Sequence, residues 1–173
     1  PAAKVEKYDE EYDVVIIGSG FAGMACALKA GRAGKKVLML EKMPVVGGNS
    51  AICGGNVACP VNPVQKAQGI KDSRELFIAD CLKDGLGLNH VELLSKIVDR
   101  CNDTIKFVED CGAEFVPNHM LFEGGHSVPR SYEIKAGTGS GYIHPMYDQI
   151  KKLSNVTVKT RAKFDDFIMD GDA

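Results

Sequence analysis

Residues 12–23 of the chain read YDVVIIGSGFAG, a β-branched apolar run that passes directly into a glycine-rich turn. The segment from Tyr12 to Ile17 is typical of a strand buried on both faces of a parallel sheet, because its apolar residues do not alternate with polar ones. Gly18, Gly20 and Gly23 then form a G-x-G-x-x-G pattern where an alanine-rich helix begins. This order of strand, turn and helix predicts a Rossmann-like α/β fold with a parallel central sheet.

The glycines of this turn predict a dinucleotide site. Gly18 permits a tight turn, Gly20 lets the backbone approach a pyrophosphate, and Gly23 lets the helix pack closely on the strand. The amino-terminal end of the helix adds N–H donors and a positive dipole end. A glycine turn without a ligand is the alternative, and the strand and helix around the turn disfavour it. We expect the site to comprise Gly18, Ser19, Gly20, Phe21, Ala22 and Gly23.

A carboxylate follows at the end of the second expected strand. The alanine-rich helix should run from Phe21 to Ala33, with Gly34 as a left-handed cap, and the strand from Lys36 to Leu40. Glu41 then lies about 20 residues after the turn, where an acidic residue accepts hydrogen bonds from ribose hydroxyls. Its charge would repel a 2′-phosphate, which disfavours NADP.

The segment after Glu41 distinguishes between dinucleotides. Residues 43–60 contain four glycines and two prolines, so we expect a long loop without helix or strand. NAD-binding folds usually pass from the acidic residue into another helix, whereas this loop offers backbone N–H groups along an extended ligand. The pattern therefore favours FAD. The expected contacts are Lys42, Met43, Gly47, Gly48, Asn49, Ser50, Cys53, Gly54 and Gly55, with Ala162 near the adenine after the strand at 156–160.

The remaining pattern predicts further elements of the same lobe. Capping boxes at Asp72-x-x-Glu75 and Asn89-x-x-Glu92 predict helices over about 73–85 and 90–110. The second helix is amphipathic and should stop at Gly112. Other expected segments are a linker at 1–11, strands at 114–116, 156–160 and 164–169, a glycine-rich loop at 123–141 and a helix at 143–153. Residues 12–173 would thus form one amino-terminal lobe.

Charge and composition exclude several classes of protein. Twenty-one Lys and Arg against 23 Asp and Glu give a net charge of −2, so we expect no nucleic-acid partner. No apolar run approaches the roughly 20 residues that a membrane span needs. The six cysteines lack metal-ligand spacing, so we expect no metal and mostly buried thiols in a reducing setting. Free thiols favour the cytoplasm slightly; a removed targeting segment would permit another compartment.

Longer stretches resemble a known family. Residues 13–55 are similar to the first FAD-binding segment of the fumarate reductase and succinate dehydrogenase flavoprotein superfamily, in particular of soluble flavocytochrome c-type fumarate reductases. Residues 124–131, GGHSVPRS, and the glycines at 137–141 resemble later motifs of the same enzymes. The resemblance implies a glutathione reductase-type FAD domain. It also implies an oxidoreductase that reduces or oxidises a C–C bond beside a carboxylate or carbonyl, and it permits a periplasmic location.

Two departures from the family pattern matter. Membrane-bound relatives attach FAD through a histidine, but no histidine occurs between Glu41 and Asn89, which implies noncovalent FAD. The family's capping domain and carboxy-terminal return segment, which carry the catalytic groups, would lie beyond Ala173. The resemblance thus implies a fold completed by the rest of the flavoprotein, as a partner chain or by self-association, with an electron-donor protein as a further possible partner. The alternative function is an FAD-binding subunit or fragment without activity until a partner chain completes it.

Catalytic residues stay unassigned at this stage. His126 is a candidate for contacting substrate, against a surface or supporting role. Arg130 is a candidate for pairing with a substrate carboxylate, against a structural ion pair. Cys53 and Cys59 are candidates for a redox couple, against the favoured alternative that both are inert buried thiols.

Overall fold

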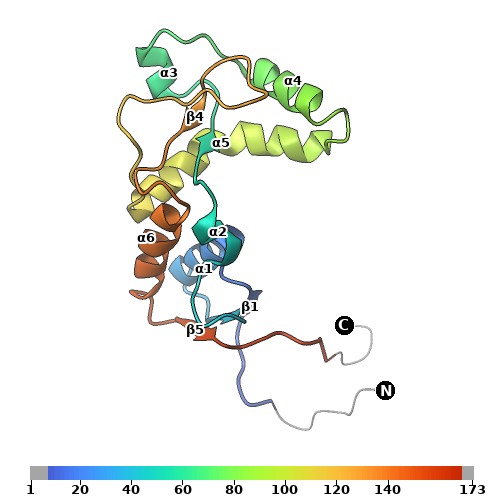
Figure 1. The fold of residues 1–173 in the computed structure, drawn as a ribbon. Helices are drawn as coiled ribbons and strands as arrows, with labels where there is room; N and C mark the ends of the chain where they lie inside the picture. Colours follow the sequence, from blue (N-terminus) through green and yellow to red (C-terminus); the bar gives the residue numbers. More distant parts are fainter. Residues whose placement is uncertain (1–7, 169–173) are drawn as a thin grey trace. The chain divides into compact units, whose positions relative to one another are not determined.

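The computed structural model describes residues 8–168, and the chain divides into two compact units. The first unit comprises residues 1–50 and 146–173, and the second comprises residues 51–145. Figure 1 shows the helices and strands of both units and labels most of them. Of the predicted linker at 1–11, residues 1–7 lie outside the described part, and residues 8–11 form no helix or strand.

The first unit is built on a parallel sheet. Strands β1 (Val14–Ile17), β2 (Val37–Glu41) and β5 (Val156–Thr160) lie in the order β1-β2-β5, and both pairings are parallel. Helix α1 (Phe21–Arg32) connects β1 to β2. Gly34 has a φ of +78° just after the helix, as predicted for a left-handed cap. The predicted α/β class and parallel sheet are therefore confirmed.

Close packing of α1 forms the core of this unit. Met24 and Leu28 of the helix are fully buried, as is Met39 of β2. Gly31 faces the last strand, and a Cβ atom there would lie 2.5 Å from Cγ2 of Val156. Only a residue without a side chain allows this approach, since real Cβ contacts are longer.

Strand β1 is covered on one face only, which corrects the expectation of burial on both. Ile16 is buried and packs toward α1, because a Cβ atom at Gly23 of the helix would lie 3.4 Å from its Cγ2 atom. Val15 and Ile17 point to the other face, where 54% and 52% of their surface is exposed. Two β-branched residues thus present an apolar face of the sheet.

The segment at 43–60 is more ordered than its composition predicts. It contains helix α2 (Gly48–Ile52) and strand β3 (Val57–Ala58), so the expectation of a loop throughout was wrong. The helix has only five residues and starts at Gly48, whose φ is +49°. This left-handed φ costs little energy at Gly48, because glycine has no Cβ atom and the residue lies in the turn where the helix begins.

In the second unit, the short strand expected at 114–116 is not formed, and a two-residue pairing is found elsewhere. Strand β3 pairs antiparallel with β4 (Ser131–Tyr132), which lies within the predicted glycine-rich loop at 123–141. The predicted strand at 114–116 is reduced to a single bridge from Phe115 to Ile134. The sheet of this unit is therefore small, and helices supply most of its core.

Three helices of the second unit precede this loop. Helix α3 (Pro63–Ala67) was not predicted, whereas α4 (Arg74–Asp84) and α5 (Val91–Cys111) were. Helix α5 ends at Gly112, whose φ of +107° is left-handed as expected. The core between these helices and the small sheet is formed by Cys59, Phe77, Val98, Cys101, Ile105, Met120 and Tyr132.

Both predicted capping boxes were wrong in detail. Ser73 caps α4 by accepting a hydrogen bond from the Leu76 N–H, because the Asp72 side chain is held by an arginine instead. His90 stands at the N-cap of α5 and makes no side-chain bond there. Asn89, the expected cap, has its Oδ1 atom buried without a hydrogen-bond partner.

The carboxy-terminal elements are shifted or absent. Helix α6 (Ser140–Ile150) begins three residues earlier than predicted, so Pro145 lies inside the helix rather than in its first turn. Residues 164–168 of the expected strand 164–169 are not a strand, since nothing in the described chain pairs with them. Met169 lies outside the described residues. No helix in the described range is long and apolar enough to cross a membrane.

Candidate dinucleotide site

The glycine-rich turn follows β1 and is tied to β2. Gly18 has a φ of +93°, and its N–H donates to the Leu40 carbonyl over 2.8 Å. A Cβ atom at Gly18 would meet nothing within 4 Å, so this side of the turn is open. A Cβ atom at Gly23 would lie 2.0 Å from the Gly18 carbonyl oxygen. The third glycine therefore permits the close helix-strand packing that the sequence predicted.

The amino-terminal end of α1 is a polar site without a side-chain cap. Gly20 is the N-cap residue, no side chain caps it, and the first turn carries no acidic residue. The Phe21 N–H donates to Oγ of Ser50 over 3.2 Å. A Cβ atom at Gly20 would lie 3.1 Å from the same Oγ atom, so the chain at Ser50 approaches the turn closely. This end of the helix has the partial positive charge that favours a phosphate.

Glu41 connects the turn to the segment that follows β2. One carboxylate oxygen accepts hydrogen bonds from the N–H and the hydroxyl of Ser19, and the other accepts from the Met43 N–H over 2.8 Å. The Ser19 hydroxyl also accepts from the Gly47 N–H over 2.9 Å. Ser19 is completely buried, and only 5% of Glu41 is exposed. The Glu41 carboxylate thereby holds the turn at Ser19 and the backbone at Met43 directly, and it holds Gly47 through the Ser19 hydroxyl.

The environment of Glu41 keeps it ionised. Burial by itself would raise the pKa of this carboxyl group, but the hydrogen bonds from Ser19 and Met43 outweigh it, and the net pKa is lowered. A carboxylate has about four lone-pair positions, and these three bonds leave about one for a ribose hydroxyl. The residues present thus fit the adenosine half of FAD.

The end of β5 lies against the end of β2. The Ala162 N–H donates to the Glu41 carbonyl over 2.9 Å, and the Arg161 N–H donates to the Met43 carbonyl over 3.1 Å. Ala162 therefore lies beside Glu41, the ribose-binding candidate. Its contact with adenine stays a prediction.

The other expected cofactor residues fall into both units. Lys42, Met43, Gly48 and Asn49 are exposed in the first unit, and a Cβ atom at Gly48 would meet nothing within 4 Å. Gly47 is buried there.

Cys53, Gly54 and Gly55 belong to the second unit. Gly55 has a structural reason to be glycine, because a Cβ atom there would lie 2.5 Å from Cγ2 of Ile134. Its carbonyl also accepts a 2.5 Å hydrogen bond from the Tyr142 hydroxyl. The roles of Cys53, Gly54 and Gly55 toward a cofactor stay predictions.

Arg130 forms a buried ion-pair network. Its side chain is fully buried, donates to both Asp72 oxygens and pairs with Asp80 over 2.5 Å. The guanidinium carbon lies 4.7 Å from the centre of the Phe77 ring. Burial opposes the charge of Arg130, but the two carboxylates raise its pKa overall. The structure gives Arg130 a structural role, and pairing with a substrate carboxylate stays a prediction.

Asp80 was not identified from the sequence, although it is central to this network. Burial would raise its pKa, but the bonds from Ser127 and Arg130 lower it to about 2. Only 5% of the residue is exposed. Its position three residues after Phe77, on the buried face of α4, is the signal that could have indicated a paired carboxylate.

His126 lies in the loop before β4 and is half-buried. Its ring meets Phe77 edge-on, with ring centres 5.5 Å apart, and its Nδ1 atom is buried without a partner. Burial and the nearby Arg130 lower its pKa, so the imidazole is neutral near pH 7. A contact between His126 and substrate stays a prediction.

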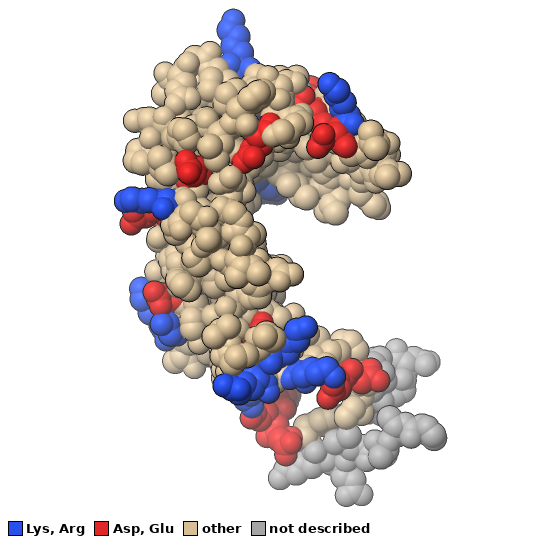
Figure 2. Space-filling model, viewed as in Figure 1, with Lys and Arg blue, Asp and Glu red and all other residues tan. Residues whose placement is uncertain are grey.

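The cysteines are all free thiols, and half of them are buried. Cys59, Cys101 and Cys111 are buried, whereas Cys26 and Cys53 are exposed. No disulfide joins Cys53 to Cys59, and the neighbouring Cys101 thiol together with burial raises the pKa of the Cys59 thiol. Among residues 8–168, no three His, Cys, Asp or Glu side chains gather as metal ligands. Figure 2 shows basic and acidic residues interspersed over one face of the molecule.

A β-α-β unit with a glycine-rich turn, a glycine at the N-cap of its helix and a carboxylate after the second strand defines a dinucleotide-binding domain. The sequence profile of one such family, described as FAD binding domain, matches residues 13–173. The chain belongs to this FAD-binding family.

Relatives in this family are larger proteins. The chain is 43% identical to the acrylate reductase flavoprotein subunit of Shewanella woodyi over 95% of its own length and 32% of that protein. It is 35% identical to the urocanate reductase of Eggerthella lenta, over 92% of the chain and 26% of that protein. The structure matches the open conformation of a flavocytochrome c3 fumarate reductase with a TM-score of 0.86 and 27% identity, covering 95% of the chain and 29% of that structure. The chain thus spans between a quarter and a third of the length of these relatives.

Proposed function

We propose that the chain binds FAD noncovalently and forms the FAD-binding portion of a reductase that acts on a carbon–carbon double bond beside a carboxylate. The observation that carries the proposal is the carboxylate of Glu41, which is fixed by Ser19 and Met43 at the end of β2. The names of the relatives, reductases of acrylate, urocanate and fumarate, support the substrate class.

Each part of the site has a role toward the cofactor. The open turn at 18–23 and the end of α1 would hold the pyrophosphate, and Glu41 would accept a hydrogen bond from the adenosine ribose. Lys42 and residues 47–55 would bind the ribityl and flavin side. The bound flavin supplies hydride transfer, whereas this chain supplies binding and orientation.

Noncovalent attachment rests on the residues available in this segment. No histidine lies between Glu41 and Asn89, so none there could bond to the flavin ring. Acid precipitation of the FAD-loaded protein should release all of the flavin into the supernatant. Yellow colour that stays with the washed, denatured pellet would show a covalent bond and overturn this part of the proposal.

The reductase activity can be tested directly. Purified protein is assayed anaerobically with reduced viologen dye as donor and with acrylate, fumarate or urocanate as acceptor. Oxidation of the dye that depends on one of these acids supports the proposal, and a saturated acid of the same length serves as the control. A flavin-loaded protein of full length that oxidises dye with none of the three acids refutes the substrate class.

A second candidate function is a cofactor-binding portion that is inactive until another polypeptide completes it. It is favoured by the length of the chain, which is between a quarter and a third of that of its relatives. The isolated 173 residues are then expected to bind FAD and to show no turnover. Turnover by the isolated chain at about 1 per second or more would rule this candidate out.

A further inference from the structure

The Ser19 hydroxyl joins two separate parts of the candidate dinucleotide site. It donates to Oε2 of Glu41, at the end of β2, and its Oγ atom accepts from the Gly47 N–H, just before α2, over 2.9 Å. The Ser19 N–H donates to the same Glu41 oxygen over 3.0 Å. All three residues belong to the first unit, so this arrangement is complete within that unit.

The polar groups of Ser19 are committed to the protein. A hydroxyl group has one proton to donate, and here Glu41 accepts it. The backbone N–H is also donated to Glu41, so Ser19 has no further N–H or O–H group for a pyrophosphate. The residue is completely buried, which leaves no surface for a ligand to touch. Any effect of its side chain on a cofactor must therefore pass through its partners.

Both partners of the hydroxyl lie where the cofactor is proposed to bind. Glu41 is the acceptor proposed for the ribose, and Gly47 begins the segment proposed for the flavin side. Gly47 is buried and has a φ of +108°, a conformation that glycine adopts readily but that its own flexibility does not fix. The bond from its N–H to Ser19 holds the chain in this conformation.

The same hydroxyl helps to keep the Glu41 carboxylate ionised. Burial would raise the pKa of Glu41, and the hydrogen bond from the Ser19 side chain is the largest of the effects that lower it. The N–H groups of Met43 and Ser19 and the charge of Lys42 lower this pKa further. Removal of the hydroxyl should therefore raise the pKa of Glu41, while the contributions of Met43 and Lys42 remain.

We propose that Ser19 is a positioning residue of the cofactor site, which aligns Glu41 and Gly47 and does not itself touch the cofactor. The role of Ser19 rests on the proposed function, since it concerns the site at which FAD would bind. It deepens that function by separating the turn into residues that face the ligand and one residue that acts through others.

Two other roles for Ser19 lead to different results. If the hydroxyl only stabilises the core, its removal leaves the pKa of Glu41 and the FAD affinity of the folded chain unchanged. If the hydroxyl contacts FAD directly, its removal weakens binding equally whether or not Glu41 is present. If Ser19 acts through Glu41, the two substitutions are not additive, which a double-mutant cycle measures.

The first measurement needs no cofactor. The pKa of Glu41 is followed by ¹³C NMR of its side-chain carboxyl group in the full cofactor-free chain. We expect the pKa of Glu41 to rise in Ser19→Ala and to take an intermediate value in Ser19→Cys, because a thiol is a weak donor. Ser154→Ala, at an exposed serine of the same unit, is the matched control and should leave the pKa of Glu41 at its wild-type value.

The second measurement is the FAD affinity at pH 7, from quenching of flavin fluorescence. Ser19→Ala should weaken binding about tenfold in the wild-type background and less than about threefold in the Glu41→Ala background.

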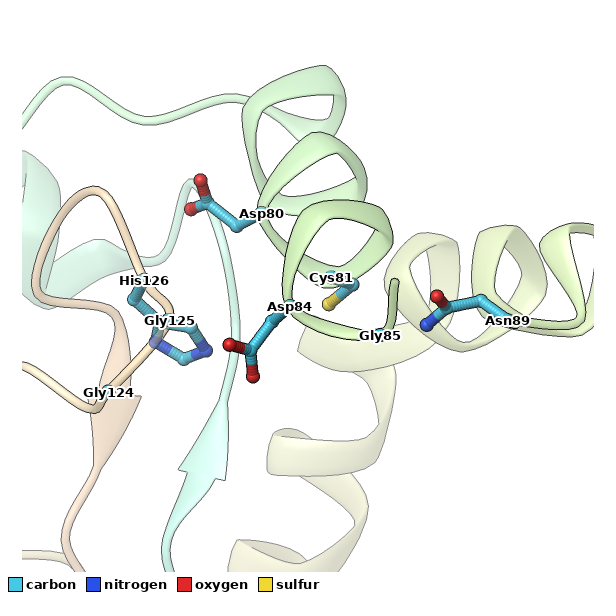
Figure 3. A pocket seen from close by; sticks show the side chains of 8 residues that line it. All are labelled: Asp80, Cys81, Asp84, Gly85, Asn89, Gly124, Gly125 and His126. Carbon is cyan, nitrogen blue, oxygen red and sulfur yellow. The ribbon is translucent and has the colours of Figure 1, made fainter. Parts of the chain in front are cut away.

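Asp84→Asn is a second control, because this exposed carboxylate lies outside the hydrogen bonds of Glu41. Asp84 is among the residues that line a cavity of about 290 Å³ in the second unit, as Figure 3 shows. This variant should bind FAD as the wild type does.

Three results would overturn the proposal. They are an unchanged pKa of Glu41 in Ser19→Ala, an unchanged FAD affinity in this variant, or an equal loss of affinity with and without Glu41. A wild-type chain that binds no FAD refutes the proposed function instead, and the pKa of Glu41 then decides by itself whether Ser19 holds the carboxylate. The amide NMR spectrum of each variant shows whether it is folded. If Ser19→Ala is unfolded, Ser19→Cys, which has a side chain of similar size, replaces it in both measurements.

Discussion

Replacing Glu41 by alanine should weaken both the folded chain and its hold on FAD. The substitution removes the acceptor of the buried Ser19 N–H and of the Met43 N–H. Ser19 cannot reach water, because it is fully buried, whereas Met43 is 49% exposed. An unsatisfied buried donor costs about 1–3 kcal/mol, and bonds to a charged acceptor are stronger than neutral ones. We expect the free energy of unfolding of the cofactor-free chain to fall by about 2–4 kcal/mol.

The same substitution should reduce the affinity for FAD. Glu41 keeps about one lone-pair position for a ribose hydroxyl, so one charge-assisted bond is lost. That loss corresponds to about 1–3 kcal/mol, or about 5- to 150-fold in the dissociation constant. Glu41→Gln keeps one acceptor oxygen and should lie between the alanine variant and the wild type.

Urea unfolding of the cofactor-free chain measures the first effect, as a lower midpoint with an unchanged slope. Quenching of flavin fluorescence during a titration without urea, where the variant is folded, measures the affinity for FAD. Glu92→Ala, at an exposed carboxylate in the first turn of α5, is the control; it should leave the affinity for FAD unchanged and lower the free energy of unfolding by less than about 1 kcal/mol. A Glu41→Ala protein with wild-type midpoint and wild-type affinity would refute the assignment of Glu41 as the organising residue of the site.

Three further results are expected. Gly23→Ala should weaken FAD binding at least about tenfold in the same fluorescence titration, because its Cβ atom would lie 2.0 Å from the Gly18 carbonyl oxygen and displace the turn; normal affinity would contradict this. Arg130→Met should cost about 3–5 kcal/mol in urea unfolding, because it leaves Asp72 and Asp80 buried without a cation, and a loss below about 1 kcal/mol would show that the network is unimportant. The pKa of Asp80 is lowered to about 2 from an ordinary 3.8, which should contribute about 2 kcal/mol to the free energy of unfolding. This contribution is fully present above about pH 4 and is lost as the pH falls toward 2. Unfolding curves in which the wild type and Asp80→Asn lose stability equally over this range would disprove it.

The glycine-rich turn and its strands could be predicted because their signals are local. The run before Gly18 and the carboxylate of Glu41 lie within one β-α-β unit, and the structure brings them together as expected. The cap of α4 could not be predicted in the same way. Asp72 has the right spacing for a capping box, but Arg130, far along the chain, holds its carboxylate instead. Because Arg130 is distant in sequence, the local pattern around Asp72 contains no sign of this ion pair.

The strand predictions failed where pairing decides the outcome. Residues 164–168 have strand-like composition, but no partner strand in the described chain lies beside them. The strand from Val14 to Ile17 did form, but its uncovered face could not be foreseen, because the exposed Val15 and Ile17 are as apolar as the buried Ile16. The apolar composition of a strand shows which side chains could be buried, but the neighbouring elements decide which of its faces are covered.

The division of the chain into a continuous and a discontinuous unit bears on the order of folding. The sheet of the first unit needs β5, because Val37 of β2 pairs with Val156, and residues 51–145 are synthesised between these two strands. Closing so long a loop is slow compared with forming contacts inside it. On the ribosome, the second unit has all of its residues before β5 emerges, so it can fold first. Strand β2 must then keep one edge unpaired until β5 has been synthesised and can pair with it.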